Sequence, residues 1–338
     1  MENLLTVAIP TYNRSAFLDW TLRILKSYID KGLYFNVLVS DNHSTDNTED
    51  VVRKWQVLMP NLSYYCQSEN KMAARNFLKC WQLFNTKYCW LLGDTRMITY
   101  REMKFLLSEL SNNHCCDAFI LNSNARLKIP SKLYSDINNL LEEQGWHITN
   151  MASCIITKDF VNHNNAMRYL NTNFVQVGIF IEHLCSLDKF SVKYMGNSDI
   201  FVNEYQIPGI VKLNGGGWRN QEIRVFARNW YMFVMSLPNQ IKLEIKEQMA
   251  KDHNLYTEFF SFHNFRVDCI NAKGLTFYND FMQNKKYLRF TTNHSVWMYS
   301  FIVYSTLILK PLYLLLRKIK YHFINKTVSL PSCESFLK

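Results

Sequence analysis

The stretch TVAIPTYNRSAFLDWTL, Thr6 to Leu22, joins a strand, a turn and a helix. The apolar, β-rich run from Leu4 to Ile9 is typical of an interior strand, and Pro10 ends it. From Ser15, the expected helix cap, apolar residues recur at helical spacing to about Tyr28. The turn between these elements therefore follows the carboxyl end of a buried strand, where open α/β sheets bind their ligands.

The alternation of strand and helix continues to about residue 95. Apolar runs predict further strands at Tyr34–Ser40, Leu62–Cys66 and Tyr88–Leu92. A polar turn that opens into a helix follows the first of these strands, and Met72–Phe84 has the spacing of another helix. This order predicts an α/β fold with a Rossmann-like, mostly parallel sheet flanked by helices.

The pattern loosens beyond Met103. We expect a helix to Leu110, strands at Asp117–Ala125 and Met151–Thr157, a polar insert at 128–144, partial helix within 171–187 and helix over 221–249. The segment KLNGGGWRN, residues 212–220, is expected to be a loop whose Trp218 and Arg219 could contact a ligand.

Composition narrows the class of protein. The chain has 338 residues, of which 48% are hydrophobic, so it can bury a large core and is not disordered. Its net charge of +10 favours acidic partners, but the cations are dispersed and no nucleic-acid module is present, so we expect no nucleic acid partner. Nine scattered cysteines without a C-x-x-C pair indicate a reducing compartment. We expect the amino-terminal run to be a strand and not a signal peptide.

The last apolar segment, Ser295 to Phe323, differs from the rest of the chain. We expect Lys310 and Pro311 to interrupt it after about fourteen apolar residues, whereas a spanning helix needs about twenty without a break. Aromatic residues suit the level of lipid headgroups, and Arg317, Lys318 and Lys320 suit anionic lipid. The segment therefore predicts a helix that lies on a membrane surface, with an ordinary buried helix as the alternative.

Four stretches carry a family resemblance: TVAIPTYNRSAFLDWTL, NVLVSDNHSTDNTEDVV, NKMAARNFLKCW and YCWLLGDTRMIT. In order and spacing they resemble family 2 glycosyltransferases, which have the GT-A fold. The resemblance is good over residues 1–110 and loose over 111–230. It implies a nucleotide-sugar-binding half at 1–110 and an acceptor-binding half at 111–230. We expect the remaining residues, 231–338, to form a C-terminal helical region with a membrane-associating segment at 295–323.

The resemblance also implies roles for residues of the first half. Thr11, Tyr12 and Arg14 would lie beside the nucleotide donor, with Tyr12 stacked on the base and Arg14 on a phosphate. Asp41 corresponds to the aspartate that binds the donor base, and a carboxylate there favours the imide N–H of uracil or thymine. Arg75 would contact phosphate or ribose. Each also has a structural alternative: a solvated helix start for Arg14, a turn cap for Asp41 and a helix surface for Arg75.

The fourth stretch departs from the family. Family members end this strand in aspartates that bind the ribose and a divalent cation, Mg²⁺ or Mn²⁺. Aligned on the apolar pair after it, the last two acidic positions here are Thr95 and Arg96, and Asp94 falls one place earlier. Three hypotheses follow. Arg96 could replace the metal in stabilising the departing diphosphate, the site could have lost catalysis, or Asp94 could still bind the ribose or the metal.

The catalytic base is the second open question. An inverting transferase needs a carboxylate or an imidazole to take the proton of the acceptor hydroxyl. The helix that should carry it places Gln176 near the expected acidic position, and an amide cannot act as a base. Glu182 and His183 on the same helix, and Asp159 after the preceding strand, are weaker candidates. The sequence assigns no base among them.

Taken together, the resemblance implies transfer of a sugar from a nucleotide-diphosphate donor to an acceptor, with inversion. Common acceptors of the family are lipid-linked oligosaccharides in the synthesis of O-antigen lipopolysaccharide, capsule or related surface polysaccharides. We therefore expect a cytoplasmic enzyme, peripheral on the inner face of the cell membrane. The alternative is a catalytically inactive GT-A domain that binds a nucleotide sugar or acts as a scaffold.

Overall fold

The computed structural model describes residues 4–113, 115–123, 127–161, 163–196, 201–204, 220–271 and 276–323. Within residues 1–140 and 147–212 these form one compact unit, and within 141–146 and 213–329 a second. The predicted loop with Trp218 and Arg219 lies outside the described residues. The division into a donor half, an acceptor half and a C-terminal region stays a prediction.

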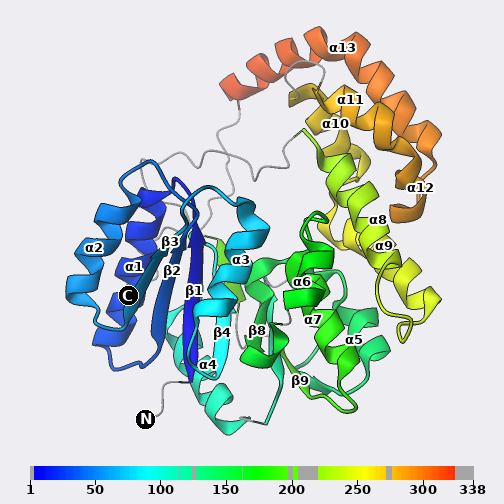
Figure 1. Cartoon of the computed structure of the whole chain (residues 1–338). Helices are drawn as coiled ribbons and strands as arrows, with labels where there is room; N and C mark the ends of the chain where they lie inside the picture. Colours follow the sequence, from blue (N-terminus) through cyan, green and yellow to red (C-terminus); the bar gives the residue numbers. More distant parts are fainter. Residues whose placement is uncertain are drawn as a thin grey trace. The chain divides into compact units, whose positions relative to one another are not determined.

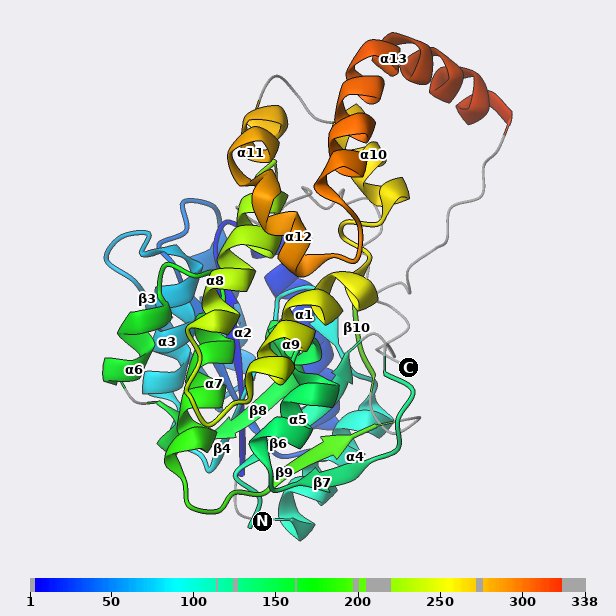
Figure 2. The same cartoon turned by 90° about the vertical axis from the view of Figure 1, so that its right-hand side faces the viewer.

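A mixed sheet forms the centre of the first unit (Figure 1). Its main path runs β3-β2-β1-β4-β8-β6-β10-β5, and β9 pairs with both β6 and β7. The strands of the described residues are β1 Leu5–Thr11, β2 Asn36–Asp41, β3 Leu62–Cys66, β4 Tyr88–Leu91, β5 Arg96–Met97, β6 Ala118–Ser123, β7 Lys132–Tyr134, β8 Cys154–Thr157, β9 Val192–Met195 and β10 Phe201–Glu204. Among β1, β2, β3 and β4, every pair of neighbouring strands is parallel. Strand β8 lies between β4 and β6 and is antiparallel to both. Figure 2 shows β4, β8, β6 and β9 side by side. The predicted mostly parallel α/β sheet is confirmed.

Helices cover both faces of this sheet. They are α1 Ser15–Asp30, α2 Thr48–Leu58, α3 Met72–Leu83, α4 Tyr100–Asn112, α5 Ile137–Gln144, which ends in the second unit, α6 His163–Tyr169 and α7 Val175–Ser186, with short 3₁₀ turns η1 His147–Thr149, η2 Met151–Ser153 and η3 Lys158–Phe160. Alternate residues of β1, including Val7 and Ile9, share one core with α1, α2 and α4. Since side chains alternate across a strand, Ala8 faces the other side, where α3 packs on β1 and β2.

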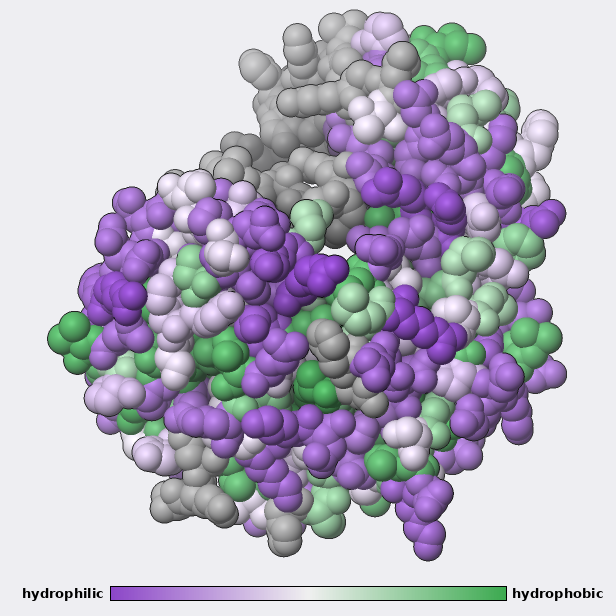
Figure 3. Space-filling view, in the orientation of Figure 1, coloured by the Kyte–Doolittle hydropathy of each residue, from purple (hydrophilic) through white to green (hydrophobic). Residues whose placement is uncertain are grey.

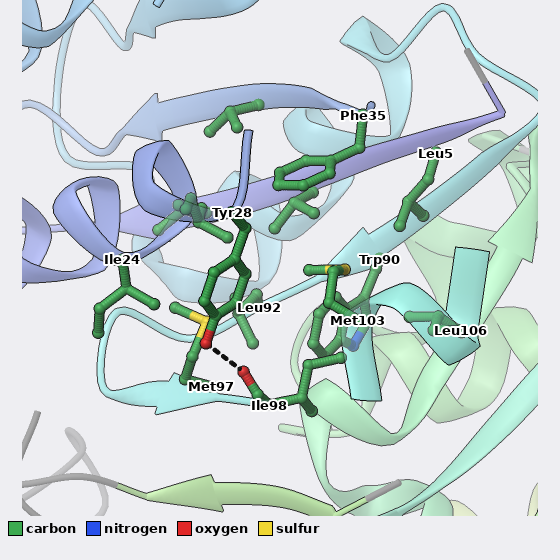
Figure 4. Packing of buried hydrophobic residues seen from close by; sticks show 14 of the residues in the cluster. Leu5, Ile24, Tyr28, Phe35, Trp90, Leu92, Met97, Ile98, Met103 and Leu106 are labelled. Carbon is green, nitrogen blue, oxygen red and sulfur yellow. Dashed lines mark hydrogen bonds between the residues drawn. The ribbon is translucent and has the colours of Figure 1, made fainter. Parts of the chain in front are cut away.

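The core under the first helix also fixes the chain after β4. Tyr28 of α1 is fully buried, and its hydroxyl donates a hydrogen bond of 2.9 Å to the carbonyl of Ile98 (Figure 4). Met97 and Ile98 are themselves fully buried in this cluster. The segment between Leu91 and Met97, which contains Asp94 and Arg96, is therefore held at both ends by core packing.

Several expectations for the first unit need correction. The predicted strand Met151–Thr157 begins as a 3₁₀ turn and becomes a strand only at Cys154. The polar insert 128–144 contains β7 and α5. Strands β5, β9 and β10 were not predicted, because each has at most four residues and depends on its partner strands.

The second unit is helical. Its elements are a π-helix η4 Arg224–Asn229, α8 Trp230–Met235, α9 Leu243–Thr257, α10 Phe262–Asn271, α11 Thr276–Asn284, a 3₁₀ turn η5 Lys285–Tyr287, α12 Leu288–Thr291 and α13 Val296–Phe323. The predicted helix over 221–249 is thus interrupted between α8 and α9. Tyr299 of α13 is buried among the phenylalanines of this unit, and its hydroxyl donates to the carbonyl of Phe260 at 2.8 Å.

The expected interruption at Lys310-Pro311 is wrong, because α13 continues through Pro311. A proline inside a helix removes one hydrogen bond and bends the axis, and Figure 2 shows a bent α13. In the part of the chain that is described, no helix combines the length and apolar character needed to cross a membrane.

Candidate active site

Three parallel strands bring the predicted donor residues to one edge of the sheet. β1 lies between β2 and β4, and its register sets Thr11 directly opposite Asp41. Asp94 follows β4 by three residues. Because the carboxyl ends of parallel strands meet at one edge, this arrangement builds a polar cluster at the position where α/β sheets bind ligands.

Hydrogen bonds join the loops that follow β1 and β2. Asn13 adopts a left-handed conformation with φ of 51°, and its N–H donates to Ser44 Oγ at 2.8 Å. The side chain of Asn13 accepts the N–H of Thr45 at 2.7 Å. Asp46 accepts the N–H of Ser15 at 2.9 Å, so the start of α1 is capped from the second loop and not by Ser15.

Asp41 lies at the centre of this edge and is only 2% exposed. One oxygen accepts the N–H and hydroxyl of Ser44, at 2.9 and 2.6 Å, and the other accepts the hydroxyl of Tyr64 at 2.9 Å. Burial and then this hydrogen bond raise the pKa of Tyr64 above that of free tyrosine. Asp41 therefore caps its own turn, as the structural alternative expected, with its carboxylate held in a fixed orientation.

Arg14 and Asp94 form an ion pair across the same edge. Arg14 Nη1 donates to Asp94 Oδ1 at 2.7 Å, and the two side chains are 31% and 5% exposed. Thr11 Oγ1 donates to Asp94 Oδ2 at 3.4 Å. The main-chain carbonyl of Asp94 accepts the hydroxyl of Thr21, on α1, at 3.0 Å. Asp94 is thereby fixed by the turn after β1 and by α1.

The remaining predicted donor residues differ in exposure. Tyr12 is 42% exposed, and Arg75 is exposed near the start of α3. Asn76, next to Arg75, is buried and binds the side chain and the carbonyl of Ser40, which ties α3 to the end of β2. Arg96 is half-buried at the start of β5, and its N–H donates to the carbonyl of Gly93 at 2.9 Å.

The residues at the end of β4 do not fit a divalent metal site of the kind that the resemblance implies. Both carboxylate oxygens of Asp94 already accept hydrogen bonds, one of them from a guanidinium, and a dication beside that guanidinium would be repelled. Across the described residues, no group of three or more histidine, cysteine, aspartate and glutamate side chains could hold a metal ion.

The candidate bases lie on α7 and on η3, the turn before α6. Gln176 donates to the carbonyl of Thr149 at 3.2 Å. Glu182 accepts hydrogen bonds from Arg168, at 2.9 Å, and from Tyr169. These contacts tie Glu182 to α6.

His183 packs its ring 4.1 Å from that of Phe160. Burial lowers the pKa of His183, and Asp159 and Asp117 oppose that shift. Asp159 itself is exposed in η3. The assignment of a base stays a prediction.

Sequence reasoning missed the residues that orient this site. Ser44 was visible in principle, because a serine three places after an aspartate commonly closes such a turn. Tyr64 and Thr21 gave no such signal, since their contacts depend on strand register and on how α1 packs.

Comparison with known proteins agrees with this geometry. Residues 6–117, which contain β1 to β4 and the polar edge, match the family model described as glycosyl transferase family 2. Over these residues, about a third of its length, the chain resembles glycosyl transferase family 2. Abequosyltransferase RfbV of Salmonella typhimurium is 31% identical over 119 residues, 34% of this chain and 35% of that protein. Validoxylamine A glucosyltransferase of Streptomyces hygroscopicus subsp. limoneus is 43% identical over 79 residues, 21% of this chain and 17% of that protein.

Two solved structures resemble the chain over most of its length. The crystal structure of S. aureus TarS 1-349 in complex with UDP superposes with a TM-score of 0.54 at 13% identity, over 85% of this chain and 83% of that one. Mannosyltransferase PcManGT from Pyrobaculum calidifontis, in complex with GDP-Man and Mn²⁺, gives 0.52 at 12% identity, over 90% and 87%. At such identities these likenesses establish the GT-A fold alone.

Proposed function

We propose that the protein transfers a sugar from a nucleotide-diphosphate donor to an acceptor hydroxyl. The observation that carries this proposal is the polar edge formed by Thr11, Arg14, Asp41 and Asp94 within a family 2 domain. In this reaction the acceptor oxygen bonds to C1 of the sugar as the bond from C1 to the diphosphate oxygen breaks. The electron pair leaves with the nucleoside diphosphate, the acceptor proton goes to a base, and inversion follows from attack opposite the leaving group.

Asp41 is the proposed contact for the donor base. Its two oxygens accept hydrogen bonds from Ser44 and Tyr64, and a longer one of 3.9 Å from the thiol of Cys66. A thiol is a weak donor, so a stronger donor can take its place. The ring imide N–H of uracil or thymine is such a donor. Tyr12, exposed in the adjoining turn, is the proposed stacking partner. Arg75 is proposed to contact the phosphates or the ribose.

A lipid-linked oligosaccharide at the inner membrane face is the proposed acceptor. The described part of α13 exposes Trp297, Phe301, Tyr304 and Ile308, at 72%, 60%, 46% and 78%. Their spacing of four, three and four residues sets them on one face of the helix. On the side of the molecule seen in Figure 3, hydrophobic residues otherwise lie scattered among hydrophilic ones.

The charges of this segment suit an anionic surface. Residues 295–323 contain four lysines and arginines, among them Lys310, and no aspartate or glutamate. Trp and Tyr beside such cations are typical of helices that lie in the headgroup region. The eight cysteines in the described ranges carry free thiols, which supports the proposed cytoplasmic location.

The function is tested by incubating the full chain with UDP, dTDP and GDP sugars and membranes that carry lipid-linked oligosaccharide. We expect release of nucleoside diphosphate from one donor, loss of that release in Asp41→Ala, and a product whose anomeric configuration is inverted by NMR. Donor binding without any release over the whole panel would contradict the proposed enzyme.

Donor binding without release of nucleoside diphosphate would instead support a donor-binding or scaffold domain without catalysis. The observation that favours this alternative is Gln176, which stands near the expected base and is engaged with the carbonyl of Thr149. Equilibrium binding of the same donors separates the two functions, because both bind a nucleotide sugar and only the enzyme releases the diphosphate.

A further inference from the structure

The end of β4 contains a buried acid that already has its counter-cation. A carboxylate that is almost fully buried needs a partner of opposite charge, because transfer of an isolated charge from water is costly. For Asp94 that partner is Arg14, which reaches it across the turn after β1. The neighbouring residues Thr95 and Arg96 add no negative charge. The negative charge of Asp94 is therefore compensated without a metal ion.

The geometry of Arg14 leaves it able to bind a second anion. A guanidinium has five N–H donors in one plane, and Asp94 Oδ1 accepts from Nη1. The guanidinium also lies over the Phe17 ring, whose centroid is 5.7 Å from the guanidinium carbon. Since 31% of the Arg14 side chain is exposed, a phosphate can approach it from solvent.

We propose that Asp94 is a positioning residue for Arg14, and that the Arg14 guanidinium, in place of a divalent metal, binds the donor diphosphate. This inference rests on the proposed function, since it assigns the charge that the departing nucleoside diphosphate meets. When the bond from C1 to the diphosphate oxygen breaks, the electron pair goes to that oxygen, and the negative charge that develops there lies against Arg14. The carboxylate of Asp94 keeps the guanidinium in place.

The test is calorimetric binding of UDP, dTDP and GDP, and of the matching nucleosides, to the full chain in EDTA and in Mn²⁺. The ratio of nucleoside diphosphate to nucleoside affinity isolates the phosphate contact, and a general loss of structure does not change it selectively. We expect this ratio to be the same in EDTA and in Mn²⁺. We expect Arg14→Gln to lower it about tenfold to hundredfold, the usual loss for hydrogen bonds to a charged group.

Asp94→Asn removes the charge that positions Arg14 and keeps the shape of the side chain. We expect it to lower the same ratio of nucleoside diphosphate to nucleoside affinity. The matched control is Lys193→Gln, which removes one positive charge and a partly buried ion pair with Glu109 elsewhere in the first unit. Its ratio should equal that of the wild type, and thermal melting of all variants shows that each is folded.

One result would contradict this inference and another would contradict the proposed function, and the two results are distinguishable. If Mn²⁺ raises the affinity for a nucleoside diphosphate at least tenfold and Asp94→Asn abolishes that gain, Asp94 is a metal ligand and the inference is wrong. If no nucleoside diphosphate binds under either condition, the proposed donor function itself is wrong.

Discussion

Replacement of three exposed residues of α13 should release the protein from anionic membranes. The change is Trp297→Gln, Phe301→Gln and Ile308→Gln in one variant. Glutamine is a good helix former, so the helix is kept while its apolar face is removed. The opposite face, which includes Tyr299 and Val303, is buried in the second unit and is left intact.

The magnitude follows from the exposed fractions of these side chains. They are 72%, 60% and 78% exposed, and full burial of one large apolar side chain contributes about 2 kcal/mol. Insertion of this face into the headgroup region should therefore contribute about 4 kcal/mol, which corresponds to a loss of about a thousandfold in partition coefficient when it is removed. Trp297 and Phe301, whose rings lie 5.9 Å apart, should supply about half or more of that loss.

The assay is co-sedimentation of the full chain with vesicles of phosphatidylglycerol and phosphatidylethanolamine, and with vesicles of phosphatidylcholine alone. We expect the wild type to bind the anionic vesicles more tightly, and added salt to weaken that preference because it screens the cations of the segment. The matched control is Val57→Gln, Leu58→Gln and Leu133→Gln, three residues of the first unit that are 82%, 51% and 60% exposed.

Equal loss of vesicle binding in the control and in the α13 variant would refute the reasoning, because exposed apolar area anywhere would then have the same effect. Unchanged vesicle binding of the α13 variant would refute the reasoning more directly. If the wild type fails to bind vesicles and elutes as a dimer in size exclusion, and the variant elutes as a monomer, the face is an interface between two copies of the chain.

Three smaller changes test other parts of the fold. Gly178→Ala should lower the free energy of urea unfolding by about 1–3 kcal/mol, because a Cβ there would lie 2.4 Å from the buried ring of Tyr169. Tyr64→Phe should lower it by about 1–3 kcal/mol, since Asp41 loses a hydroxyl donor, and should weaken donor binding in calorimetry. Burial lowers the pKa of His183, so the unfolded chain takes up that proton first as pH falls below about 6.5. The stabilising contribution is therefore present above this pH and lost below it, and His183→Gln should reduce the fall in melting temperature between about pH 7.5 and about pH 5.5.

The first four strands could be predicted from the sequence because each is a short β-rich run, and β1, β2 and β4 are almost fully buried. The predicted strand Leu62–Cys66 coincides with β3, and the strand at Tyr88 differs from β4 by one residue. Fully buried strands carry this signal in their own residues. The short strands β5 and β10 do not, since their pairing is fixed by where the surrounding chain brings them.

The candidate site was predicted as a set of residues but not as a set of contacts. The sequence indicated Arg14 and Asp94 separately, as a phosphate ligand and as a ribose or metal ligand. Their ion pair joins residues 80 positions apart, and it depends on the register of β1 with β4. The cap that Asp46 provides at the start of α1 could not be predicted for a similar reason. A capping residue from another loop gives no sequence signal next to the helix that it caps.

This ion pair also bears on the three hypotheses for the end of β4. A metal site there needs several carboxylates, since a dication is held by the sum of their charges. With Thr95 and Arg96 at the expected acidic positions, Asp94 alone would give a weak site, and its buried charge would be uncompensated whenever the metal dissociated. Arg14 supplies permanent compensation. We therefore propose that a positioned arginine takes the place of a metal at this edge, and donor binding that is indifferent to EDTA is the direct consequence of that proposal.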